Sequence, residues 1–303
     1  QFRLQASEIR QITGLPLSPH YGVGKLRWLL MNHPQVMSAG EQKDLCMGPL
    51  ASYLIQHLLT NSPHQVDHSN AHRTLLFDLE KLDWSQPLLE LFEIPETYLP
   101  QTRPMLTNWG EIITGCIPLK LVCGDQNAAL YSYGDLVETT AVVNLGTGAF
   151  ILMPQQRGAA LPPALLKGIA YSNAESHQYL IEGTVNGAGS ALNWAQQQRP
   201  VEDLFGFLDR WLEDIQSPPV FVNTFGGLGS PWWKTDIEPY FINQNPAPAE
   251  ARYVSVIESI AFLLQHNIER IEERQELKTL YIGGGLSRLD GLCQRLADLS
   301  GLE

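Results

Sequence analysis

The sequence predicts an α/β protein in two parts, residues 1–136 and residues 137–303. A chain of 303 residues is long for a single hydrophobic core. Helical periodicity prevails before residue 136, whereas strand-like runs, glycine turns and helices alternate after it. We therefore expect the second part to be α/β and the first to be the mainly helical remainder of a larger domain.

Three helices are predicted at the start of the first part. Residues 7–12 form the first, and Gly14 after them is a typical helix stop. Residues 24–31 and 45–59 are two further helical stretches.

The segment 61–104 is polar and interrupted by prolines, so we expect an ordered connection that carries short helices. Its His64, His68 and His72 recur at a four-residue spacing that would align them on one helix. Pro63 and the polar neighbours favour a solvated loop over a metal site.

Asp125 lies between a strand-like run and a helix. Residues 117–122 are predicted to form a short buried strand, and residues 128–131 are predicted to be helical. With Gly124 at the junction, Asp125 is an N-cap or first-turn residue. On this fragment alone a helix cap is the simpler interpretation, and a catalytic base is the alternative.

The second part opens with a predicted β-hairpin. Residues 139–144 and 149–153 are strand-like and flank a tight turn at 145–148. A further strand is expected at 178–181, followed by a glycine-rich turn and a helix through Trp194.

The end of the chain combines a long helix with a glycine loop. Residues 251–274 place apolar side chains on one helical face. A strand at 280–282, three glycines at 283–285 and a helix from Asp290 follow.

Three glycine turns are candidates for phosphate binding. They are the GTG turn at 146–148, with the hydroxyl of Thr147, the glycines that open the helix after residue 186, and the GGG run at 283–285. Each has a plainer interpretation as a hairpin turn or a packing glycine. Neither a Walker A loop nor a Rossmann fingerprint is present. In combination, a hairpin clamp and a late glycine loop suit a nucleotide in a cleft between two domains.

Composition narrows the classes of partner. The net charge is −12 and no basic cluster stands out, which argues against nucleic acid. Four scattered cysteines favour a reducing cytoplasm over a disulfide framework or a zinc site. No signal peptide and no run long enough to span a bilayer is found, so we expect no membrane contact.

Seven stretches spread over nearly the whole chain carry a resemblance to a known family. In order they are GKLRWLL (24–30), DHSNAHRTLLFDLEKLDW (67–84), CGDQNAAL (123–130), NLGTGAF (144–150), EGTVNGAGSALNW (182–194), FGGLGSPWW (225–233) and IGGGLSRLDGLCQRLADLSG (282–301). Taken in this order they resemble the FGGY carbohydrate kinases, which include glycerol kinase and xylulokinase.

The resemblance implies an actin-like, ribonuclease-H-like fold of two domains, with ATP, Mg²⁺ and a sugar or polyol in the cleft. Asp125 would be the general base and would contact Mg²⁺ directly or through a water. Gln126 would hydrogen-bond the substrate. The nucleotide would be contacted by Gly146, Thr147, Gly148, Gly189, Asn193, Gly284, Gly285 and Asp290.

The chain departs from the family in two respects. His20 stands where glycerol kinases usually carry a tyrosine that touches the substrate, so His20 is a candidate substrate contact and glycerol itself is in question. The family's first strands, with their acidic phosphate loop, and its closing helices have no counterpart in these 303 residues. By family analogy, a homodimer is a common assembly.

Two alternatives remain beside a carbohydrate kinase. One is a non-catalytic remnant that binds a nucleotide or a partner, since the family's first strands are not in this sequence. The other is an ATPase of the actin-like superfamily without a sugar substrate, which the GDQ and LDW stretches make less favourable.

Overall fold

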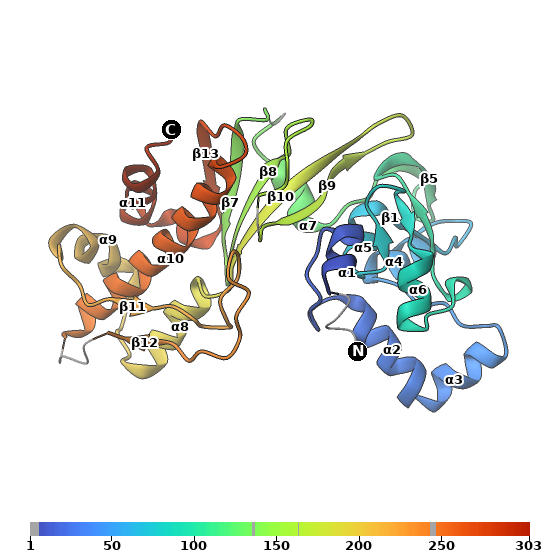
Figure 1. The fold of residues 1–303 in the computed structure, drawn as a ribbon, viewed down its shortest axis with the longest axis horizontal. Helices are drawn as coiled ribbons and strands as arrows, with labels where there is room; N and C mark the ends of the chain where they lie inside the picture. The colour runs from blue at the N-terminus through green and yellow to red at the C-terminus, as the bar shows by residue number, and fades with distance from the viewer. Residues whose placement is uncertain (1–5, 135–136, 163, 243–246) are drawn as a thin grey trace. The chain divides into compact units, whose positions relative to one another are not determined.

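The structure is a computed structural model that describes residues 6–134, 137–162, 164–242 and 247–303. The chain divides into two compact units (Figure 1). The first comprises Gln1–Ser132 with Leu166–Leu180, and the second comprises Tyr133–Leu165 with Ile181–Glu303.

The first unit mixes helices with very short strands. Its helices are α1 (Ala6–Thr13), α2 (Gly22–Asn32), α3 (Pro34–Glu41), α4 (Leu50–Leu58), α5 (His68–His72), α6 (Gln86–Phe92), the 3₁₀-helix η2 (Glu96–Tyr98) and α7 (Asp125–Leu130). Its strands are β1 (Gln65–Asp67), β2 (Phe77–Asp78), β3 (Asp83–Trp84), β4 (Gln101–Arg103), β5 (Leu106–Ile112), β6 (Ile117–Leu121) and β9 (Leu166–Ser172).

The segment 61–104 carries the short helices that the sequence predicts, namely α5, α6 and η2, but it also contains four short strands that were not predicted. There β1 pairs in parallel with β4, and β2 pairs antiparallel with β3. Strands of two or three residues are too short to produce a readable alternation of apolar and polar side chains, so the sequence did not reveal them.

The strand predicted before Asp125 exists, but it is not buried. It is β6, which forms an antiparallel hairpin with β5. Ile117 and Leu121 are 57% and 52% exposed, because only one face of this hairpin is packed, against a small cluster around Trp109. The apolar residues of this segment therefore predicted the strand correctly, but they did not predict that it is exposed.

The predicted solvated loop around the histidines is also wrong. His68 and His72 lie on α5 and are buried. Asp67 caps this helix, because its carboxylate accepts hydrogen bonds from the backbone N–H groups of Ser69 and Asn70. The cap starts a helix where the preceding proline suggested a loop.

The second unit is built on a mixed sheet. Its elements are β7 (Thr140–Leu145), β8 (Ala149–Pro154), α8 (Gly189–Gln198), α9 (Leu204–Asp214), β11 (Phe221–Val222), β12 (Tyr240–Phe241), α10 (Ala249–Glu272), β13 (Thr279–Gly283), the 3₁₀-helix η3 (Gly285–Arg288) and α11 (Asp290–Ser300). The strand order is β13-β7-β8-β10-β9, where β10 (His177–Val185) runs from the first unit into the second.

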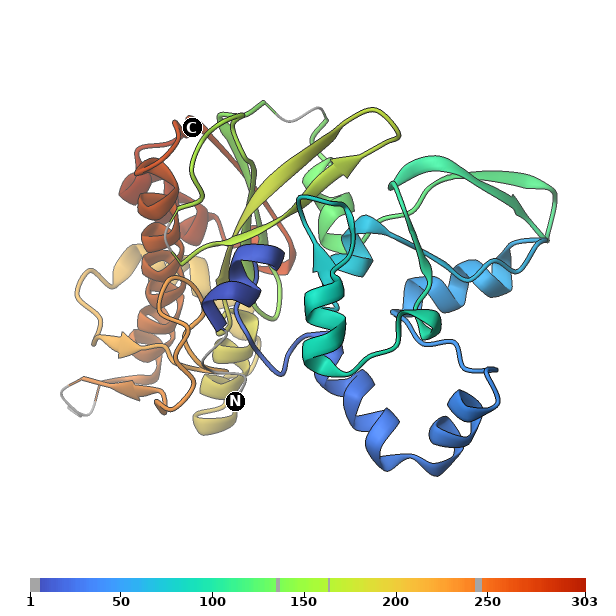
Figure 2. The same cartoon turned by 45° about the vertical axis from the view of Figure 1, so that its right-hand side comes forward.

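The elements predicted for the second part are confirmed. β7 and β8 form the antiparallel hairpin with the GTG turn at its tip, and β13 pairs in parallel with β7. α10 covers the predicted long helix and is buried along its apolar face. It lies with α11 on one side of the sheet (Figures 1 and 2). Among the described helices, none is both long enough and apolar enough to span a membrane.

Candidate functional site

Asp125 opens α7, directly after the extended residue Gly124. Its side chain is exposed, and Oδ1 accepts a hydrogen bond from the backbone N–H of Gln126 at 2.7 Å. Gln126 follows in the first turn and is half-buried. A carboxylate in this position lies at a helix start, where negative charge is favoured.

A hydrogen-bonded relay fixes the backbone in front of Asp125. The N–H of Gly124 donates to the hydroxyl oxygen of Ser69 at 2.8 Å. That hydroxyl in turn donates to the carboxylate of Asp67. The loop that carries Asp125 is therefore tied to the start of α5, far away in sequence.

Asp67 is the anchor of this relay and is fully buried. In addition to Ser69, Asn70 donates two hydrogen bonds to the Asp67 carboxylate, one from the Asn70 backbone N–H at 3.1 Å and one from the Asn70 side-chain amide at 2.6 Å. Burial raises the pKa of the Asp67 carboxyl, and the hydrogen bonds from Ser69 and Asn70 oppose that rise. Burial also raises the pKa of the Cys123 thiol, and the charges of Asp67 and Asp125 add to the effect.

α7 has a second attachment within the first unit. The side-chain amide of Asn127 donates to the carbonyl oxygen of Ile169 on β9 at 2.5 Å. Together with the Ser69 relay, this contact holds both ends of the first turn, so Asp125 is presented from a fixed backbone.

His20, the other candidate substrate contact, is exposed just before α2. Its carbonyl oxygen accepts a hydrogen bond from Nζ of Lys25 at 2.7 Å, and its ring lies edge-on to Tyr21 with centroids 5.7 Å apart. His20 and Asp125 thus occupy separate elements of the same unit.

In the second unit, the GTG turn packs against the start of α8. The carbonyl oxygen of Gly146 accepts a hydrogen bond from the N–H of Gly189 at 3.0 Å. The carbonyl oxygen of Thr147 accepts one from the N–H of Ser190 at 2.9 Å. The Thr147 side chain is exposed at the tip of the turn. Gly148 is required by packing, since a Cβ there would lie 2.9 Å from the carbonyl oxygen of Val185.

The GGG run reaches the same end of the sheet. Gly283 ends β13 opposite Asn144 of β7. Gly284 has a φ of +94°, and a Cβ on it would lie 2.6 Å from both Asn144 Oδ1 and the Leu145 carbonyl oxygen. The three predicted glycine loops therefore meet where the parallel strands β7 and β13 end, the edge at which open α/β sheets bind ligands.

The remaining predicted contacts lie on the helices beside these loops. Asn193 is exposed on α8, one turn after Gly189. Asp290 is exposed as the first residue of α11, beyond η3. Asp209 of α9 accepts the N–H of Gly291 at 3.0 Å, so two carboxylates lie at this helix start. The structure thus brings Asn193 near the glycine loops along one helix, whereas Asp290 follows the GGG run by one short helix.

Sequence reasoning missed Asp67 and Ser69 as site residues. The signal was present, because an aspartate with serine and asparagine two and three residues later is the pattern of a side-chain cap. What could not be read was the partner of Ser69, the N–H of Gly124. Within the described residues, no group of three or more histidine, cysteine or carboxylate side chains is arranged to hold a metal ion.

Comparison with known proteins gives the family. The N-terminal domain of the FGGY family of carbohydrate kinases matches residues 1–118, and its C-terminal domain matches residues 141–303. The glycerol kinase of Mycoplasma genitalium is 32% identical over 98% of this chain and 62% of its own length. The glycerol kinase of Thermococcus kodakarensis is 30% identical over 96% of this chain and 60% of its own length. The chain therefore spans about three fifths of these relatives.

Solved structures share the fold. The glycerol kinase of Plasmodium falciparum with ADP has a TM-score of 0.87 at 23% identity, covering 98% of this chain and 62% of that one. A ligand-bound xylulose kinase from Lactobacillus acidophilus has a TM-score of 0.83 at 20% identity, covering 99% of this chain and 62% of that one. At these identities the likeness concerns the fold, and it confirms the predicted two-domain α/β architecture.

Proposed function

The chain belongs to the FGGY family of carbohydrate kinases, and from this premise we propose that the whole protein transfers the γ-phosphoryl group of ATP to a hydroxyl of a sugar or polyol. Asp125 is the general base of this reaction. The observation that carries the proposal is the presence, in a member of this family, of an exposed carboxylate on a tethered helix start together with three converging glycine loops.

Asp125 suits the role of base because its carboxylate is exposed while its backbone is held. An alcohol is a poor nucleophile at neutral pH, so a fixed carboxylate that accepts its proton assists attack. The hydroxyl oxygen then forms a bond to the γ-phosphorus, the bond from that phosphorus to the bridging oxygen breaks, and ADP leaves. The proton of the alcohol ends on Asp125.

The glycine loops of the second unit suit the nucleotide. Exposed Thr147 at the tip of the GTG turn offers a hydroxyl to a phosphate oxygen. Gly285 has open space where a Cβ would stand, so a ligand can approach its backbone closely. Asn193, exposed on the same face of α8 as Gly189, is available to the nucleoside.

Mg²⁺ fits this arrangement without a cage of protein ligands. In nucleotide sites Mg²⁺ keeps several waters and is held by one or two carboxylates together with phosphates. Asp125 would be its protein contact, directly or through a water, and the bound ion neutralises phosphate charge.

The substrate is proposed as a polyol or sugar, with Gln126 and His20 as its contacts. Both sequence relatives named above are glycerol kinases, so glycerol is the first compound to assay. An imidazole at position 20 in place of a phenol changes the size and polarity of the contact, so xylulose and longer polyols belong in the same screen.

The test is the Asp125→Asn variant, assayed for phosphotransfer with MgATP and for ATP binding by calorimetry. The amide retains the oxygen that accepts the Gln126 N–H but cannot take the proton. We expect turnover to fall by at least about a hundredfold and ATP affinity to be nearly unchanged. Asp44→Asn, at another exposed aspartate of the same unit, is the matched control and should keep full turnover.

The outcomes separate the alternatives. Near-normal turnover of the Asp125→Asn variant would refute the assignment of the base. ATP binding by the unaltered protein, without transfer to any polyol or sugar, would favour a non-catalytic nucleotide-binding role instead.

A further inference from the structure

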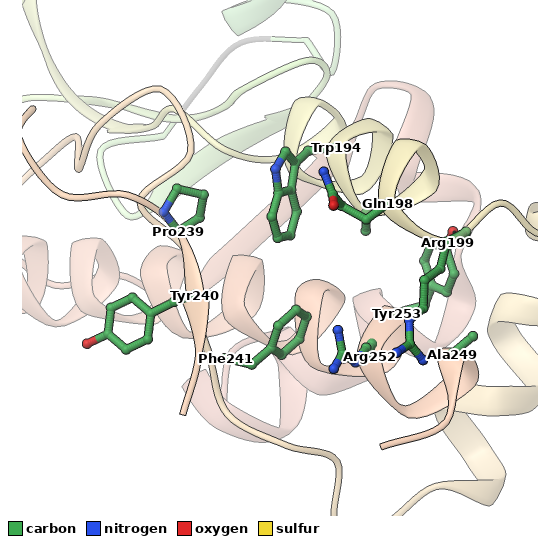
Figure 3. A pocket seen from close by; sticks show the side chains of 10 residues that line it. Trp194, Gln198, Arg199, Pro239, Tyr240, Phe241, Ala249, Arg252 and Tyr253 are labelled. Atoms are coloured by element: carbon green, nitrogen blue, oxygen red, sulfur yellow. The ribbon is translucent and has the colours of Figure 1, made fainter. Parts of the chain in front are cut away.

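A pocket lies in the second unit, at the carboxyl-terminal end of α8. Its volume is about 300 Å³. Figure 3 shows Trp194 and Gln198 of α8 on one side of the space, and Phe241 of β12 and Arg252 of α10 on the other. Small-molecule sites start at about this size, so the pocket suits a ligand of one or two rings.

The pocket is cationic although the chain is acidic overall. Among the residues that the structure describes, its lining includes two arginines and no carboxylate; the lining residues are Trp194, Ala195, Gln198, Arg199, Pro239, Tyr240, Phe241, Ala249, Arg252 and Tyr253. The pocket also adjoins the amino-terminal end of the 24-residue helix α10, which begins at Ala249. In a protein of net charge −12, this is a local environment that favours an anion.

Arg252 has a donor that the described chain leaves unused. Its Nε is buried and has no hydrogen-bond partner among the described residues. The guanidinium carbon lies 4.8 Å from the centre of the Phe241 ring, so the plane of the group is supported by an aromatic face. The Arg199 guanidinium donates a long hydrogen bond, at 3.4 Å, to the Ala247 carbonyl oxygen.

The pocket wall is aromatic and held in place. Trp194 stacks on Phe221 with centroids 5.4 Å apart and lies 6.4 Å from Phe241 at an interplanar angle of 26°. The hydroxyl of Tyr253 donates toward the Arg199 carbonyl oxygen at 2.6 Å, which fixes the far side. The ring contacts and this hydrogen bond hold the aromatic wall of the pocket in one arrangement.

This pocket faces away from the proposed nucleotide contacts. Successive residues of an α-helix are rotated by about 100°, so Asn193 and Gly189 share one face of α8. Trp194, Ala195 and Gln198 lie on another face. The pocket is thus a separate site on the helix that the nucleotide loops use at its other end.

We propose that this pocket binds a planar aromatic carboxylate of one or two rings. The carboxylate pairs with the fork of Arg252, assisted by Arg199, and the ring packs on Trp194 and Phe241. A guanidinium presents parallel N–H donors that match the two carboxylate oxygens, and a stacked aromatic wall selects a flat body.

The experiment is calorimetric titration of the protein with 2-naphthoate and, separately, with 2-naphthamide, its neutral isostere. We expect saturable binding of 2-naphthoate that is about tenfold or more stronger than binding of the amide. Arg252→Gln should weaken 2-naphthoate by a similar factor. Arg210→Gln, at an exposed arginine of α9 outside the pocket, is the matched control and should leave binding unchanged.

Each outcome decides the proposal. Absence of 2-naphthoate binding, equal affinity for the acid and the amide, or equal loss in the Arg252 and Arg210 variants would overturn it. The comparison of acid with amide needs no substitution, so it decides the matter even if the Arg252→Gln variant does not fold. Phosphotransfer and ATP binding do not enter this test, which therefore stands apart from the proposed kinase activity.

Discussion

His72 makes the stability of the first unit depend on pH. The ring is 1% exposed, and its Nε2 donates to the Thr13 carbonyl oxygen at 2.8 Å, which fixes the neutral tautomer. The pKa of His72 is lowered from 6.5 to about 3, chiefly by burial and secondly by the nearby charge of Arg73, while the hydrogen bond to Thr13 opposes the change. The folded chain therefore keeps this imidazole neutral across most of the acidic range.

The sign and the size of the effect follow from proton binding. Below a pH of about 6.5 the unfolded chain takes up a proton on His72, whereas the folded chain does so only near pH 3. The unfolded state binds more protons in that window, so stability is lost as the pH falls through it. One pH unit corresponds to about 1.4 kcal/mol, and the step from pH 7 to pH 5 should remove about 2 kcal/mol through this residue.

The assay is urea unfolding at pH 7 and pH 5, followed by circular dichroism, for the unaltered protein and for His72→Gln. The amide of glutamine can donate a hydrogen bond but does not titrate, so the pH-dependent loss should be smaller in the variant by about 2 kcal/mol. If the two units unfold in separate transitions, the one that the His72→Gln substitution shifts at pH 7 is that of the first unit, which contains His72. His57→Gln, at an exposed histidine of α4, is the control and should retain the full loss. An identical pH dependence in His72→Gln and the unaltered protein would refute this reasoning.

Two further predictions concern the candidate site. Ser69→Ala removes the acceptor of the Gly124 N–H and should lower the unfolding free energy by about 1–3 kcal/mol. Ser69→Thr keeps the hydroxyl and should recover most of this loss. If Ser69→Ala and the unaltered protein are equally stable in urea, the hydrogen bond from Gly124 to Ser69 does not support the fold. Gly284→Ala should destabilise the second unit by more than about 2 kcal/mol, while Gly285→Ala should stay within about 0.5 kcal/mol but bind ATP several-fold more weakly. Equal losses of thermal stability in Gly284→Ala and Gly285→Ala would contradict the packing explanation for Gly284. Unchanged ATP affinity of Gly285→Ala on calorimetry would contradict a nucleotide contact at Gly285.

The parts of the fold that could be predicted are those with strong local signals. The apolar face of α10 repeats over many turns, and the GTG hairpin carries its own turn residues, so both emerged from the sequence. The strands β2 and β3, of two residues each, have no such signal, because their pairing is decided by tertiary contacts. The exposure of β6 was hidden for the same reason, since burial depends on what covers a strand.

The candidate site likewise contains features that could be predicted from local sequence and others that could not. Asp125 and its helix start were readable, because a strand, a glycine and a helix follow each other directly. The support from Ser69 was not, since the hydrogen bond joins residues far apart in sequence. The sequence likewise marked each glycine loop separately, and only the parallel pairing of β13 with β7 brings the loops to one edge.

The reason that glycine is needed differs among the positions of these loops. A Cβ on Gly148, Gly189 or Gly284 would lie within 3.0 Å of a backbone oxygen of a neighbouring segment, so these three are explained by the packing of the loops on one another. Gly285 has nothing within 4 Å of such a Cβ, and at Gly146 the contact is an ordinary 3.7 Å. Packing therefore leaves Gly146 and Gly285 unexplained, and close approach of the nucleotide to their backbone is the reason that the proposed function would supply. The contrast between Gly284→Ala and Gly285→Ala consequently tests whether the loop serves the fold, the nucleotide, or each through a different glycine.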